Sequence, residues 1–141
     1  MPRRKRDLPK GILRVGSKEL RVRLMYDPYN KAWEAKLSKT QLRSILLGFA
    51  GKILIKHSYV YDPNYDGVVN VEEGWRKLSP EGIKWIIDRN LKYAESITYN
   101  PKNGFITVYD GAGNIYHLKI EGVETRLVPT YIPKWCGGHH G

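Results

Sequence analysis

Lysine and arginine are concentrated near the start of the chain. The first 24 residues contain nine of them against only Asp7 and Glu19, and so carry seven of the ten net positive charges. Clustered guanidinium and ammonium groups attract phosphates and other anions, which favours a polyanionic partner. The first candidates for a binding site are therefore these cations: Arg3, Arg4, Lys5, Arg6, Arg14, Arg21 and Arg23.

Aromatic residues add a second property, because the chain has ten tyrosines and four tryptophans. A ring beside a cation suits a nucleic acid, since each base offers a π face and the backbone offers phosphates. We predict a small basic protein that binds DNA or RNA through phosphate contacts of its N-terminal arm and hairpin, with no catalysis assigned. An acidic protein surface presents the same negative charge, and the cations alone do not distinguish these partners.

The segment from Asp62 to Glu73, DPNYDGVVNVEE, resembles the loop of an EF-hand calcium site in its spacing. The resemblance implies Ca²⁺ as the cofactor and oxygen ligands from Asp62, Asn64, Asp66, the Val68 carbonyl, Asn70 and Glu73, with Gly67 at the sharp turn. It covers twelve residues, and the preceding residues resemble a strand where that family has a helix. The alternative interpretation is a polar turn in which Asp, Asn, Pro and Gly serve the backbone.

Two further groups of residues suit metal chemistry. Asp27, Glu34 and Lys36 match the residue types of a Mg²⁺-dependent nuclease, in which carboxylates hold the metal and a lysine assists at the phosphate. An ordinary hairpin with a cross-strand ion pair gives the same pattern. Near the end of the chain, Cys136, His139 and His140 are Zn²⁺ ligand types, and His57 or His117 would have to complete the site. The alternative for the tail is an irregular segment without metal.

The secondary structure that must position these residues follows from the sequence pattern. Gly16-Ser17 predicts a tight hairpin turn, with Val15 opposite Lys18 and Arg14 opposite Glu19. The period-two alternation then separates the hairpin into two faces. Apolar residues fall on one face (Leu13, Val15, Leu20, Val22 and Leu24), and polar residues fall on the other (Arg14, Glu19, Arg21 and Arg23).

Two helices and further strands follow the hairpin. Ser38 with Gln41 three residues later predicts a helix start through a capping box, and Ser79-Pro80 predicts the start of a second helix. Residues 52–61 are rich in β-branched and aromatic side chains and predict a strand, followed by a loop over 62–74. Residues 97–127 alternate strand-like runs with turns, which is typical of an antiparallel meander.

The expected fold is therefore α+β, with two helices packed on a mainly antiparallel sheet, an N-terminal hairpin and a C-terminal β-meander. We expect a mobile basic arm over 1–10, a single domain over 11–128 and an irregular tail over 129–141. No run of about 18 apolar residues is present, so no membrane contact is expected, and the charged start lacks the apolar core of a signal peptide.

These features predict an intracellular, cytoplasmic protein, and the scarcity of glutamine leans toward a heat-adapted source. The alternative to nucleic-acid binding is a structural or assembly protein of a virion or ribonucleoprotein, which would form homo-oligomers and carry the calcium loop. The Mg²⁺-dependent nuclease is the second alternative.

Overall fold

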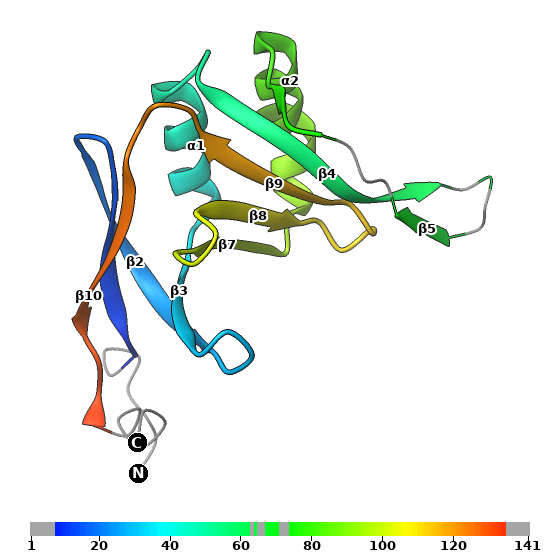
Figure 1. The fold of residues 1–141 in the computed structure, drawn as a ribbon. Coiled ribbons are helices and arrows are strands. Elements are labelled where there is room, and N and C mark those ends of the chain that lie inside the picture. The colour runs from blue at the N-terminus through cyan, green and yellow to red at the C-terminus, as the bar shows by residue number, and fades with distance from the viewer. Residues whose placement is uncertain (1–7, 63, 65–66, 71–73, 135–141) are drawn as a thin grey trace.

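The computed structural model describes residues 8–62, 64, 67–70 and 74–134 of the chain, and it shows a mixed α+β fold (Figure 1). Two helical segments pack on one antiparallel sheet. Its strands are β1 (Lys10–Val15), β2 (Lys18–Asp27), β3 (Ala32–Lys36), β4 (Ile53–Asp62), β5 (Gly67–Asn70), β6 (Arg76–Lys77), β7 (Ser96–Asn100), β8 (Phe105–Tyr109), β9 (Ile115–Ile120) and β10 (Thr125–Tyr131).

The strand order is β10-β1-β2-β3-β7-β8-β9-β4-β5, and the short β6 pairs with β4. From the sequence we expected two helices packed on a mainly antiparallel sheet, and the sheet has more strands than that expectation implied. β7, β8 and β9 form the predicted meander, but the prediction that the meander continues through 127 is wrong. β10 leaves β9 and pairs with β1 instead, with Leu127 opposite Leu13 and Tyr131 opposite Lys10. The strand therefore extends three residues beyond the expected domain end at 128.

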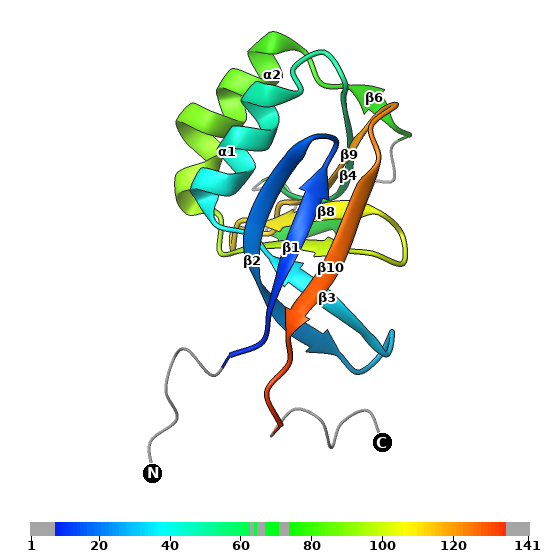
Figure 2. The ribbon, with the colours of Figure 1, turned by 90° about the vertical axis from the view of Figure 1, so that its left-hand side faces the viewer.

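The sheet bends between β3 and β7, where only two residue pairs connect the strands. In Figures 1 and 2, β10, β1 and β2 stand at a steep angle to β8, β9 and β4, and both helices lie on the same side of the molecule. The inner face of the bend holds the core, which includes Leu13, Val15, Val108, Tyr116 and Leu118, all at most 1% exposed. The hydroxyl of Tyr99 on β7 donates to the Thr125 carbonyl of β10 at 3.2 Å, which links the two arms of the bend.

Both helix starts are confirmed. α1 (Lys39–Gly48) begins with a reciprocal capping box between Ser38 and Gln41, and it buries Leu42, Ile45 and Leu46 against the sheet. α2 (Pro80–Trp85) begins at the Ser79 cap with Pro80 in its first turn. The chain then continues as a π-helical turn, η3 (Ile86–Asn90), and a 3₁₀ turn, η4 (Leu91–Tyr93). No helix among the described residues has the length and apolar character needed to span a membrane.

A buried polar network ties η3 to the meander. The Tyr116 hydroxyl donates to Asn90 Oδ1 at 2.5 Å, and Asn90 Nδ2 donates to Asp110 Oδ2 at 3.3 Å. Asp110 also accepts from the backbone N–H groups of Ala112 and Asn114, at 2.9 and 3.1 Å, which holds the turn between β8 and β9. Burial raises the pKa of the Tyr116 hydroxyl, and the charge of Asp110 adds to this effect, so Tyr116 stays a protonated donor.

Candidate nucleic-acid interface

The hairpin of β1 and β2 places its arginines as the sequence predicted. Gly16 turns with φ +60°, and Arg14 pairs with Glu19 while Leu13 pairs with Leu20. Direct partners in an antiparallel pair point to the same side. Leu13, Val15, Val22 and Leu24 are buried, so the alternate positions Arg14, Arg21 and Arg23 lie exposed on the opposite, outer face of the sheet.

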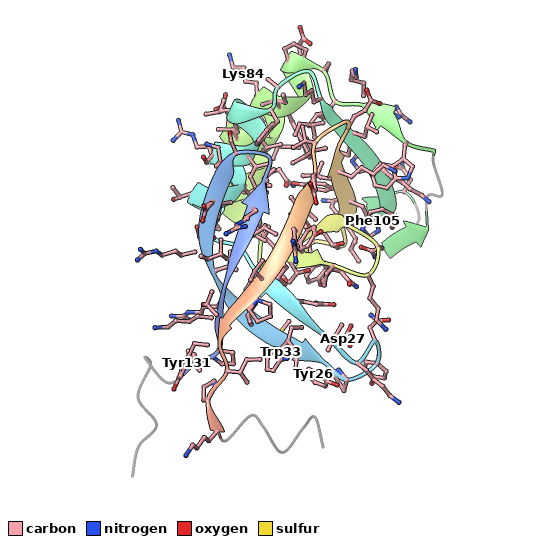
Figure 3. The ribbon with its side chains drawn as sticks, turned by 60° about the vertical axis from the view of Figure 1, so that its left-hand side comes forward. Tyr26, Asp27, Trp33, Lys84, Phe105 and Tyr131 are labelled. Atoms are coloured by element: carbon pink, nitrogen blue, oxygen red, sulfur yellow. The ribbon has the colours of Figure 1, made fainter. Side chains whose placement is uncertain are left out.

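Three more exposed cations lie on this outer face, one on β1 itself and two on the neighbouring strands β3 and β10. Lys10 pairs with Arg23, Arg23 pairs with Lys36 on β3, and Arg14 pairs with Arg126 on β10. The register therefore brings six cations together over four adjacent strands, and we call this group the basic face: Lys10, Arg14, Arg21, Arg23, Lys36 and Arg126. Figure 3 shows this part of the sheet with its side chains.

The charges of the basic face are largely uncompensated. Arg14 makes a long ion pair with Glu19, 4.0 Å between Nε and Oε2, with both side chains more than half exposed. The structure shows no ion pair between the other five cations and any described carboxylate. An exposed ion pair such as Arg14–Glu19 is weak, so it does not prevent Arg14 from binding an anion. All six cations of the basic face therefore remain able to bind one.

The surface is hollowed on both sides of Arg21 and Arg23. One hollow, of about 500 Å³, is lined by Lys10, Ile12, Thr130 and these two arginines. The other, of about 430 Å³, is lined by the same arginines with Lys36, Ser38 and Gln41. Two adjacent hollows that share two guanidinium groups suit the phosphates of an extended anion better than one compact ligand.

An exposed ring lies at one edge of the basic face. Tyr131 on β10 pairs with Lys10 and is 43% exposed. Lys10 pairs in turn with Arg23, so this ring lies next to the cations, at a point where the register between β1 and β10 shifts. This arrangement of ring and cations matches the general requirement for contacting both bases and phosphates.

Two residues of the nuclease hypothesis, Asp27 and Glu34, lie close together at the end of β2 and β3 beside their connecting turn. Burial raises the pKa of Glu34, and a hydrogen bond with Asp27 and the Asp27 charge add to this effect. Slight burial raises the pKa of Asp27, but hydrogen bonds from Asn30, Tyr29 and Glu34 outweigh it and lower the value. Both shifts come in part from the closeness of the two carboxyl groups.

The oxygens of Asp27 already serve the turn between β2 and β3. Oδ1 accepts from the Tyr29 backbone at 2.9 Å, and Oδ2 accepts from Asn30 Nδ2 at 2.6 Å. Lys36 is on the same face of the sheet as Glu34. It lies directly opposite Arg23 and therefore belongs to the basic face. A metal ion bound here would compete with the hydrogen bonds that Asp27 accepts in the turn, and the nuclease hypothesis stays a prediction.

The calcium hypothesis falls on a segment that the structure describes in part. Asp62 ends β4, while Val68 and Asn70 lie in β5, opposite Tyr61 and Tyr59. The expected loop over 62–74 therefore contains a strand, because the apolar pair Val68-Val69 continues the sheet beside β4. Asn64 is exposed, and Asp66 and Glu73 lie outside the described residues.

The zinc candidates Cys136, His139 and His140, and the arm residues Arg3, Arg4, Lys5 and Arg6, also lie outside the described residues. His57 contacts the Tyr116 ring, with centroids 5.7 Å apart, and His117 sits between two hydroxyl groups. Within the part of the chain that the structure describes, no three His, Cys, Asp or Glu side chains gather closely enough to hold a metal ion.

Sequence reasoning missed half of the basic face. Lys10 had been assigned to the arm, Lys36 to the nuclease pattern, and Arg126 to no site. The alternation of β1 could have placed Lys10 on the same side as Arg14, since they are four residues apart in one strand. Arg126 carried no such signal, because its place depends on the long-range pairing of β10 with β1.

Comparisons with family models, with curated proteins and with solved structures found no match to this chain.

Proposed function

We propose that this protein binds nucleic acid through its basic face, chiefly by phosphate contacts. The observation that carries the proposal is the gathering of six exposed cations on the outer face of four adjacent strands. Adjacent strands are about 4.8 Å apart and alternate residues of one strand about 6.8 Å apart, so the cations form a lattice along which a polyanion can lie.

The cations of the basic face have fixed positions on the sheet, unlike scattered surface charges that only keep a protein soluble. The backbones of Lys10, Arg23 and Lys36 are held in one ladder, so their order across the sheet is fixed. Four of the six cations are arginines, whose planar guanidinium groups can hold a phosphate with two hydrogen bonds. Contacts of this kind position a nucleic acid without reading its sequence, so we expect broad sequence tolerance.

The arm supplies a second set of cations to the same interface. Arg3 to Arg6 precede Lys10 by four to seven residues in the sequence, so phosphate contacts by these residues would add to those of the basic face. In this proposal the ordered face sets where the polymer lies, and the arm adds further phosphate contacts along it.

The test compares two double variants of equal net charge. Arg21→Gln with Arg23→Gln removes two cations from the basic face, whereas Lys84→Gln with Arg89→Gln removes two exposed cations from α2 and η3. Fluorescence anisotropy with labelled single- and double-stranded DNA and RNA measures the affinities. Because charge-assisted contacts contribute about 1.5 kcal/mol or more each, the first variant should bind at least about tenfold more weakly than the second.

An equal effect of the two double variants would refute the interface, because attraction would then depend only on the total charge. Absence of binding by the unmodified protein at low salt would refute the proposal itself.

A further inference from the structure

The outer face continues beyond the basic face across the bend of the sheet. Lys36 pairs with Thr98, Thr98 with Thr107, Thr107 with His117, and His117 with Lys56. Because direct partners share a face, one unbroken row of side chains crosses β3, β7, β8, β9 and β4. The basic face and the outer surface of the meander therefore belong to the same side of one sheet.

A cluster of rings lies on this continuation, and we call it the aromatic patch: Trp75, Phe105, His117 and Lys119. The Trp75 and Phe105 rings meet edge to face with centroids 4.9 Å apart, and the Phe105 and His117 centroids are 5.8 Å apart. These rings are half-buried and lie outside the hydrophobic core. They pack on one another across the polar side of the sheet, where each keeps some contact with solvent.

Cations accompany the rings. Lys119 Nζ lies 4.8 Å from the Trp75 centroid and 5.9 Å from the Phe105 centroid. Lys56 is close enough to His117 for its charge to act on that ring. Among the described outer-face positions of β7, β8, β9 and residues 53–58 of β4, no Asp or Glu is present. The patch is therefore electrostatically complementary to an anion.

His117 is held in one orientation. Its Nε2 lies 2.7 Å from Ser58 Oγ, and its Nδ1 lies 2.9 Å from Thr107 Oγ1. Ser58 reaches this position because β4 bulges between His57 and Tyr59, which re-aims the extra residue. Burial lowers the pKa of His117, and the charge of Lys56 lowers it further, so the ring is neutral at pH 7.

We propose that the aromatic patch stacks bases of a single-stranded nucleic acid whose phosphates lie on the basic face. Three strand spacings separate Lys36 from His117, about 14 Å, so one short strand can contact both regions. A duplex keeps its bases stacked on each other, and only a single strand can present their faces to Phe105 and Trp75. This inference rests on the function proposed above and adds the form of the polymer.

The test uses a labelled 12-nucleotide single strand, the same strand with abasic sites at its six central positions, and the matching duplex. All three offer backbone phosphates, but the abasic strand lacks the bases that would stack. Each stacked base is expected to strengthen binding by about fivefold or more. The unmodified protein should therefore bind the complete strand at least about fivefold more tightly than the abasic strand or the duplex.

Variants at Phe105 locate the effect. Phe105→Leu keeps an apolar side chain but removes one π face, so the preference for the complete strand should fall by about fivefold while binding of the abasic strand stays as before. Phe105→Tyr keeps the ring and should keep the preference. Trp85→Leu removes an aromatic side chain, 44% exposed on α2, and serves as the matched control with no expected change.

Equal affinity of the unmodified protein for the complete and abasic strands would overturn the stacking proposal while leaving phosphate binding by the basic face intact. Equal loss on both strands in Phe105→Leu would also overturn it, because the ring would then act only through the fold. If neither strand binds at low salt, the proposed function fails together with this inference.

Discussion

The salt dependence of binding can be worked out from the number of cations on the basic face. The first variant changes Arg3, Arg4, Lys5 and Arg6 to Gln, which removes the cations of the arm and leaves the basic face unchanged. Each phosphate contact to a single strand contributes about 0.7 to the slope of log affinity against log salt. Six contacts then predict a slope of about −4.2, or a loss of affinity of about 340-fold between 50 and 200 mM salt.

Removing Arg21 and Arg23 in the same background leaves four cations on the face. The predicted slope falls to about −2.8, and the loss over the same salt range falls to about 50-fold. The unmodified chain, with the four arm residues also in contact, should reach a slope of about −7. Anisotropy titrations of one labelled strand at five or more salt concentrations measure these slopes.

A slope near zero in the arm-neutralised protein would refute the reasoning, because all phosphate contacts would then belong to the arm. A slope that Arg21→Gln with Arg23→Gln leaves unchanged would refute the placement of the contacts on β2.

Two further predictions concern the body of the fold. Tyr116→Phe removes the donor to buried Asn90 Oδ1 and should lower the free energy of unfolding by about 1–3 kcal/mol in urea titrations. Tyr109→Phe, at an exposed position, should change this free energy by less than about 0.5 kcal/mol. Equal values for the two variants would contradict a stabilising role of the buried network. The pKa of His117 is lowered from its usual 6.5, so its imidazole should titrate below that pH in NMR spectra assigned with His117→Gln. A lowered pKa means that the unfolded chain binds more protons than the folded protein at this position. The stability attributable to His117 is therefore complete above about pH 6.5 and is lost as the pH falls through the folded-state pKa. An NMR titration midpoint of His117 at or above pH 6.5 would contradict the burial of this ring beside Lys56.

Local patterns in the sequence were sufficient for the elements that depend on neighbours in the chain. The Gly16-Ser17 turn fixed the register of β1 and β2, and alternation then assigned Arg14, Arg21 and Arg23 to one face. The Ser38 and Ser79 caps are likewise decided within one helical turn.

Long-range pairing set the features that the sequence did not reveal. β10 follows β9 along the chain, and a further hairpin was the local expectation, but its partner is β1. Arg126 consequently reached the basic face without any local signal. The aromatic patch has the same origin, because Trp75 meets Phe105 and Lys119 only after β4, β6, β8 and β9 have assembled.

Competing local preferences explain two other differences. Residues 62–74 are rich in Asp, Asn and Gly and were expected to form a loop, yet Val68 and Val69 pair with Tyr61 and Val60. The second helix starts at Ser79-Pro80 as predicted, but the structure widens it into a π-helical turn at Ile86–Asn90. That turn contains the buried Asn90, whose hydrogen bonds to Tyr116 and Asp110 belong to the tertiary structure.

NMR mapping can show directly which strands of the sheet contact the nucleic acid. Backbone amide shifts of the full-length protein would be followed while the 12-nucleotide single strand is added at low salt. We expect the largest changes on β10, β1, β2 and β3, around Lys10, Arg21, Arg23 and Lys36, and little change on α1 and α2. Changes centred on the two helices, or none at saturating strand, would contradict binding through the basic face.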